Sequence, residues 1–107
     1  MSATSVWPDG KTCGVVVTVN FDAESVDLHE TAKENLYGRF SYGRYGMRAG
    51  AWRLFDVFRA HGLKTPCFVP ALDAENNPGV VEAAVKDGHE IAARGYAFED
   101  HSKLGDA

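Results

Sequence analysis

The sequence predicts an α/β fold in which parallel strands alternate with helices. Residues 13–21 form a nearly unbroken run of apolar, mostly β-branched side chains, which is typical of a strand covered on both faces. After Ala51 and again after Pro78, the apolar residues change to the three- and four-residue spacing of a helix. The resulting order, β-α-β-α-β, specifies parallel strands joined by right-handed crossovers.

The segment before the first helix contains two irregular regions. A turn is predicted at residues 7–10, where Pro-Asp-Gly precedes the first strand. Residues 38–50 hold four glycines among aromatic and arginine side chains, which makes a regular element improbable there. A loop of this length inside a compact domain is usually functional or a linker, and its composition favours function.

The first helix is predicted from one apolar face that runs from Ala51 to Phe58. This face contains Ala51, Leu54, Phe55 and Phe58. Gly62 follows as a C-terminal cap. Residues 65–69 then form a short predicted strand, in which Pro66 is tolerated because it stands near the start.

The second helix is predicted to begin at Asn77 and Pro78, an N-cap followed by a first-turn proline. Its apolar stripe contains Val80, Val81, Ala84 and Val85. Gly88 ends it, and residues 89–93 form a third, weaker strand. The tail, residues 95–107, shows no closing element.

Three parallel strands and two helices leave sheet edges bare and part of the sheet uncovered. The chain has 107 residues, which is enough for one modest domain and too few for two. We therefore expect residues 1–107 to be part of a single larger α/β domain. The rest of that domain would come from a missing C-terminal part or from a second chain, and a homo-oligomer is one form of such an assembly.

Composition excludes several classes of protein. The chain has a net charge of −4 and 45% hydrophobic residues, which argues against disorder and against general nucleic-acid binding. No apolar run is long enough to span a membrane, and the first residues lack the apolar core of a secretory signal. We expect a cytoplasmic protein with reduced thiols.

The cysteines and histidines form no recognisable metal-binding pattern. Cys13 and Cys67 fall in predicted strands and are expected to be buried, unreactive thiols. Solvent-facing or capping positions are expected for the histidines, which are His29, His61, His89 and His101.

Ligands of parallel α/β folds bind at the carboxyl ends of the strands, which here are residues 20–24, 70–73 and 94–101. Asp22 and Glu24 could act there as a general base, a metal ligand or an orienting group, or could simply cap a turn. Asn20 would share a face with them if the strand continued. Arg94 would face Asp22 and suit an anionic or carbonyl-bearing substrate, although a surface ion pair is the ordinary alternative.

Four segments occur in an order that resembles a known family: residues 17–25, 45–55, 62–69 and 88–96. Together they resemble the N-terminal part of the polysaccharide deacetylase (NodB-homology) superfamily. The pattern is most similar to the intracellular branch with peptidoglycan deacetylase-like proteins, metal-independent allantoinases and cyclic-imide hydrolases. This resemblance implies part of a distorted (β/α) barrel, longer than this chain, that hydrolyses carbon–nitrogen bonds in acetamides or cyclic amides.

The resemblance also indicates which positions carry the chemistry. Metal-dependent relatives use an Asp base and a zinc site made of one Asp and two His. In this sequence Asn20 stands at the position of the base, and Asp22 matches the metal-binding Asp. Arg94 and Phe98 stand at the positions of the two histidines. One carboxylate alone is not a credible zinc site, so no cofactor is expected.

The leading hypothesis is metal-free hydrolysis of a small amide, ureide or cyclic imide. Asp22 or Glu24 would orient water, and Arg94 or Arg48 would polarise a carbonyl. The remaining predicted substrate contacts are Asn20, Trp52, Tyr96 and Phe98. A second hypothesis is a catalytically degenerate subunit that binds a small anionic ligand or completes an assembly. Zinc-dependent deacetylation of peptidoglycan or chitin ranks third.

Overall fold

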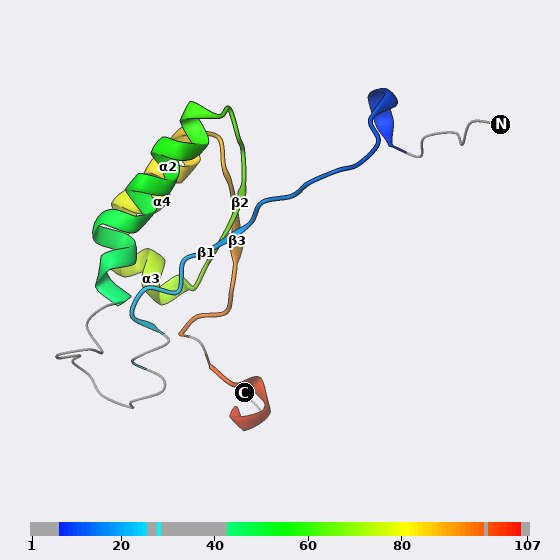
Figure 1. Cartoon of the computed structure of the whole chain (residues 1–107). Coiled ribbons are helices and arrows are strands. Elements are labelled where there is room, and N and C mark those ends of the chain that lie inside the picture. Colours follow the sequence, from blue (N-terminus) through cyan, green and yellow to red (C-terminus); the bar gives the residue numbers. More distant parts are fainter. Residues whose placement is uncertain (1–6, 26–27, 29–42, 98, 106–107) are drawn as a thin grey trace.

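The computed structural model describes residues 7–25, 28, 43–97 and 99–105. A three-stranded parallel sheet of order β1-β2-β3 organises them (Figure 1). Its strands are β1 (Val19–Asn20), β2 (Pro66–Val69) and β3 (Glu90–Ala93). In register, Val19 lies opposite Cys67, which lies opposite Ile91. The predicted α/β class and the parallel pairing are confirmed.

Two helices, α2 (Ala51–Ala60) and α4 (Pro78–Lys86), pack on one side of the sheet (Figure 1). Both match the predicted helices. Of the predicted apolar stripes, Leu54 and Val85 are exposed, and the buried members are Ala51, Phe55, Phe58, Val80 and Ala84. Gly62 and Gly88 follow them with φ of +64° and +83°, the left-handed conformation expected of glycine caps. A further short helix that the sequence did not predict, α3 (Ala71–Asn76), begins directly after β2.

The hydrophobic core lies between the sheet and these helices. The rings of Phe21 and Phe55 meet edge to face, with centroids 5.8 Å apart. Burying a phenylalanine ring stabilises a fold by about 1.5–3 kcal/mol, so Phe55 is a principal contributor. The buried apolar residues are Phe21, Met47, Ala51, Phe55, Phe58, Cys67, Val69, Val80 and Ala84.

His89 belongs to this core, so the expected solvent-facing or capping position is wrong for this residue. Its ring stacks on Phe55 and meets Phe58 edge to face, at centroid distances of 5.5 and 5.6 Å. The backbone N–H of Thr65 donates to His89 Nδ1 at 3.1 Å, which leaves the proton of the neutral ring on Nε2. Nε2 is buried and has no hydrogen-bond partner within the described part of the chain.

The first strand is much shorter than predicted. Only Val19 and Asn20 pair, whereas Val15 and Val16 are 84% and 76% exposed. The register explains this, because the residue before Val19 would face Pro66, which starts β2 and lacks an N–H. Cys13 is consequently exposed, and the prediction of a buried thiol holds only for Cys67, whose pKa is raised by burial.

The expected loop at residues 38–50 is wrong over its last part. Gly46–Gly50 form a π-helix, η3, which continues directly into α2. Met47 is buried on the same side as Ala51 one turn later, so packing against the core outweighs the poor helix propensity of the glycines. Residues 38–42 lie outside the described residues.

Two short 3-10 turns lie near the two ends of the described region. Pro8–Gly10 (η1) coincide with the predicted turn, and His101–Lys103 (η4) lie in the tail. No helix that the structure describes is long and apolar enough to cross a membrane. No described helix covers the second face of the sheet (Figure 1). Asn20, Phe68 and Ala92 lie opposite one another in register on neighbouring strands, and Asn20 is exposed.

Candidate functional site

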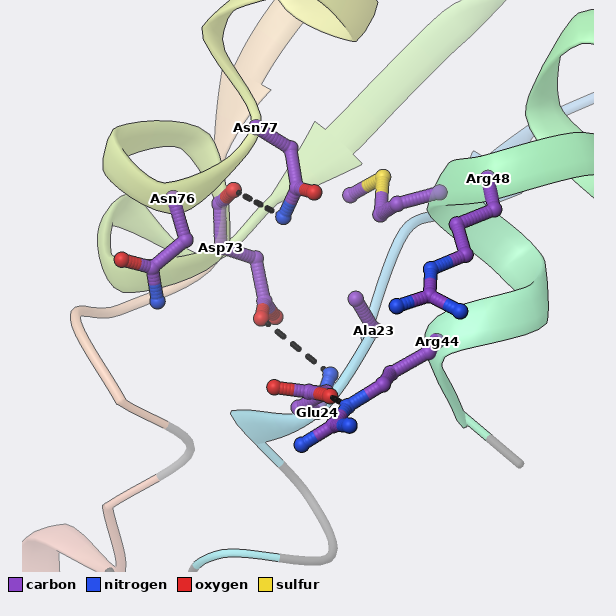
Figure 2. Close-up of a pocket in the computed structure, with 8 residues that line it drawn as sticks. Ala23, Glu24, Arg44, Arg48, Asp73, Asn76 and Asn77 are labelled. Atoms are coloured by element: carbon purple, nitrogen blue, oxygen red, sulfur yellow. Dashed lines mark hydrogen bonds and ion pairs between the residues drawn. The ribbon is translucent and has the colours of Figure 1, made fainter. Parts of the chain in front are cut away.

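Two adjacent cavities open at the carboxyl ends of β1 and β2. The first, here named the Asp22 cavity, has a volume of about 270 Å³ and is lined by Asn20, Phe21, Asp22, Ala23, Gly43, Gly46 and Met47. The second, here named the Glu24 cavity, has a volume of about 280 Å³ and is lined by Ala23, Glu24, Arg44, Met47, Arg48, Asp73, Asn76 and Asn77 (Figure 2). Ala23 and Met47 belong to both linings, so the cavities share a wall.

Asp22 and Arg94 form an ion pair across the end of the sheet. Asp22 follows β1 and Arg94 follows β3, and Arg94 Nε donates to Asp22 Oδ1 at 2.7 Å. The side chains are 20% and 37% exposed, so this charge-assisted hydrogen bond is partly shielded from water. The juxtaposition follows from the strand order, which separates these two residues by one strand only.

Asp73 is a buried carboxylate that anchors the segment after β1. It lies on α3 and is only 2% exposed. The Ser25 hydroxyl donates to Asp73 Oδ2 at 2.5 Å, and the Glu24 backbone N–H donates to Oδ1 at 3.3 Å. Burial raises the pKa of Asp73 because it disfavours the charged carboxylate, although the bonds from Ser25 and Glu24 oppose this shift.

Sequence reasoning pointed to residues 70–73 as a strand end without singling out Asp73. The signal was an acidic side chain directly after a buried strand. The sequence did not predict α3. Asp73 lies in the first turn of this helix, which directs its side chain toward Ser25. Asn77 supports the same arrangement, since its side-chain amide donates to the Asp73 carbonyl at 2.9 Å (Figure 2).

Opposite Asp73, two arginines approach the Glu24 cavity from the segment that leads into α2. Arg44 forms an ion pair with Glu24 through its Nε (Figure 2). Arg48 lies one turn later, on η3, and its guanidinium points toward the same cavity (Figure 2). Within the described residues, Arg48 has no hydrogen bond or ion pair.

The loop after β3 is tied to α3 and thereby positions Arg94. The N–H groups of Ala71 and Leu72 donate to the carbonyls of Gly95 and Tyr96 at 3.1 and 2.9 Å. Glu99 closes the loop by accepting from two backbone N–H groups, of which Tyr96 N lies at 2.8 Å. These two bonds lower the pKa of Glu99 to about 2.

The predicted site residues are only partly brought together. Asn20 and Asp22 line the Asp22 cavity, and Glu24 and Arg48 line the Glu24 cavity. Trp52 lines neither cavity; it is partly exposed on α2 and donates to the Met47 carbonyl at 3.1 Å.

Two further predicted contacts lie beyond both cavities or outside the described structure. Tyr96 lines neither cavity, and its hydroxyl donates to Glu75 Oε2 at 3.1 Å. Glu75 raises the pKa of Tyr96 by accepting this bond and by its negative charge. Phe98 lies outside the described residues.

The described residues do not fit a zinc site. Across residues 7–25, 28, 43–97 and 99–105, no three His, Cys, Asp or Glu side chains gather in a group that could hold a metal ion. Asp22, which the resemblance matches to the metal-binding Asp, accepts a hydrogen bond from Arg94 Nε at 2.7 Å. A guanidinium cannot act as a metal ligand because it has no lone pair to donate. The described side chains at this edge of the sheet therefore do not support a chemical step that depends on a metal ion.

Comparison with known proteins gives three consistent matches. The profile of the polysaccharide deacetylase family matches residues 10–107. A candidate polysaccharide deacetylase from Schizosaccharomyces pombe is 32% identical over 54 residues, which cover 50% of this chain and 17% of that protein. The crystal structure of a candidate polysaccharide deacetylase from Mycobacterium smegmatis matches with a TM-score of 0.85 and 34% identity. The match covers 97% of this chain and 37% of that one, so the chain spans well under half of either relative.

Proposed function

The chain belongs to the polysaccharide deacetylase family, and we propose that it takes part in metal-independent hydrolysis of a carbon–nitrogen amide bond. Its fold, a partial NodB-like α/β arrangement of three parallel strands, is the one that the Mycobacterium smegmatis structure shares. The substrate class under this proposal is a small amide, ureide or cyclic imide.

The observation that carries the proposal is the Asp22–Arg94 ion pair. Arg94 stands where the resemblance places a zinc-binding histidine, and its guanidinium contacts the carboxylate that matches the metal-binding Asp. A fixed positive charge thus lies beside Asp22. Such a charge stabilises the negative oxygen that develops when water attacks a carbonyl, without Lewis-acid chemistry.

The chemical step then needs only groups at the end of the sheet. Arg94 donates a hydrogen bond to the carbonyl oxygen of the substrate amide. A water molecule attacks the carbonyl carbon, and the carboxylate of Asp22 or Glu24 accepts a proton from this water. The carbon–nitrogen bond breaks as the same carboxyl group returns that proton to the leaving nitrogen. Asn20 cannot accept a proton, so its role is to orient the substrate or the water by hydrogen bonds.

The test is hydrolysis by the purified protein, assayed with acetamides, ureides and cyclic imides in the presence of a chelator. Activity that survives chelation and disappears in Asp22→Asn supports the proposal. Asp56→Asn is the matched control, because it makes the same chemical change on the exposed side of α2. Undiminished activity in Asp22→Asn, or activity that requires added zinc, would contradict it.

A second candidate function is binding without turnover. It is favoured by Asn20, which lines the Asp22 cavity at the position of the family base and has no carboxylate to accept a proton. Saturable binding of a small anion with no hydrolysis of any of the three substrate classes would support this function over the first.

We expect the proposed activity to involve further polypeptide over the face of the sheet that no described helix covers. Support comes from the exposure of Val15 and Val16 and from the row of Asn20, Phe68 and Ala92, over which the described part of the chain places no helix. We expect either a second chain or further sequence of the same protein to cover them. Native and denaturing mass spectra of the protein from its source distinguish these two arrangements.

A further inference from the structure

We propose that the Glu24 cavity binds a carboxylate group of the substrate and that Arg48 is its main contact. This inference rests on the proposed function, since it names the substrate class for the same site. It adds that the amide or imide carries a negatively charged group close to the bond that is cleaved.

The first argument is the state of Arg48. Its side chain is exposed on η3, its guanidinium points into the cavity, and no described residue pairs with it (Figure 2). Arg44 is the other arginine of the cavity, and Glu24 already neutralises it. A guanidinium presents two parallel donors that match the two oxygens of a carboxylate, so Arg48 is suited to this group.

The second argument is the charge on the opposite wall. Asp73 is the remaining acidic side chain of the lining, but it is almost fully buried, and its oxygens accept bonds from Ser25 and Glu24. Neither acidic side chain of the described lining therefore pairs with the guanidinium of Arg48.

The third argument is size and position. A volume of about 280 Å³ is slightly below the range of about 300–1,000 Å³ that is typical of pockets for drug-sized ligands, so a small group fits best. The cavity shares Ala23 and Met47 with the Asp22 cavity. A carboxylate held by Arg48 would thus lie in the cavity next to the one that Asp22 lines.

The test compares two probes that differ in charge only at one end, N-acetylglycine and its neutral methyl ester. Titration calorimetry or chemical-shift titration on the purified protein measures the affinity for each. Charge-assisted bonds to a carboxylate predict that N-acetylglycine binds at least about tenfold more tightly. Equal affinities, or no binding of the anion at millimolar concentration, would overturn the proposal.

Variants of Arg48 assign the effect to this side chain. Arg48→Gln is expected to remove the preference for the anion, whereas Arg48→Lys keeps the charge, loses the paired donors and retains part of the preference. Arg53→Gln is the matched control because Arg53 is an exposed arginine on α2 that lines neither cavity. If Arg48→Gln still binds N-acetylglycine more tightly than the methyl ester, Arg48 is not the main contact of the carboxylate.

The two proposals fail in different ways. Tight, Arg48-dependent binding of N-acetylglycine without hydrolysis of any amide would refute the proposed hydrolysis and support the carboxylate-binding site. Hydrolysis of neutral and anionic amides at equal kcat/KM would uphold the hydrolysis and refute the carboxylate site.

Discussion

The Ser25 hydroxyl donates to the buried carboxylate of Asp73 at 2.5 Å, a bond between residues 48 positions apart in the sequence. It joins the segment after β1 to α3, which follows β2. Asp22 and Glu24 lie on the segment held in this way, so the geometry of both cavities depends on a residue outside the predicted site.

Ser25→Ala is expected to destabilise the protein. The substitution removes the donor and leaves the buried Asp73 Oδ2 with one bond fewer, which costs about 1–3 kcal/mol of the free energy of unfolding. Urea unfolding measures this cost. Ser102→Ala provides the control, since Ser102 bonds to Asp100 at the exposed η4 and its loss should change stability by less than about 0.5 kcal/mol. Equal effects of the two substitutions would contradict the buried anchor.

The raised pKa of Asp73 predicts a pH dependence of stability. Between pH 3.8, the ordinary pKa of an aspartate, and the raised pKa of Asp73, the folded protein keeps the Asp73 proton that the unfolded chain loses. The folded protein therefore binds more protons than the unfolded chain in this pH interval. The stabilisation from this group is complete below pH 3.8 and is lost as the pH rises through the raised pKa. Urea unfolding at a series of pH values measures the free energy of unfolding of Asp73→Asn and of the unsubstituted protein. We expect the value for Asp73→Asn to rise relative to that of the unsubstituted protein as the pH rises. A difference that stays constant with pH would contradict the shift.

Glu99 predicts a pH dependence of the opposite sign. Its pKa falls from 4.5 to about 2 because backbone N–H groups of Tyr96 and Ala97 bond to the charged form. The resulting stabilisation is present above pH 4.5 and is lost as the pH falls toward 2. Glu99→Gln should flatten the acid limb of the stability profile, while Glu82→Gln on the exposed side of α4 should leave it unchanged. Identical profiles for both variants would refute this assignment.

Arg94→Gln is expected to lower kcat by about 10²–10³-fold, as the loss of one preorganised donor to a developing oxyanion does. Steady-state kinetics on a hydrolysed amide, once one is identified, measures the loss. Arg59→Gln serves as the control, because Arg59 pairs with Asp56 and Asp87 on the surface of the helices. A change in KM with kcat unaltered would instead make Arg94 a substrate-binding residue only.

His89→Ala is expected to cost roughly 2–5 kcal/mol of the free energy of unfolding, the range for truncating a large core side chain. The ring fills the space between Phe55 and Phe58, and its loss also leaves the Thr65 N–H without its acceptor. Thermal or urea unfolding measures the effect. His61→Ala, at the exposed end of α2, should change stability little; a comparable loss there would argue against a specific core role.

Much of the fold could be predicted because local patterns specify it. The apolar stripes after Ala51 and Pro78 determine two helices, and the alternation of strands and helices determines a parallel sheet. Parallel order places the carboxyl ends of all three strands at one edge. That rule was sufficient to predict that Asp22 and Arg94 lie near each other.

Other features depend on partners distant in the sequence, and only the tertiary structure decided them. The valines at positions 15–17 have strong strand propensity, yet β1 pairs only as far as the register with β2 permits. Gly46–Gly50 form a π-helix because Met47 is buried in the core. His89 is buried because its ring packs against Phe55 and Phe58. Asp73 faces inward because Ser25 lies across from it. The sequence by itself determined the order and type of the three strands and of α2 and α4, because these depend on local patterns. Long-range packing and hydrogen bonding determined α3, η3, the extent of β1 and the position of Asp73.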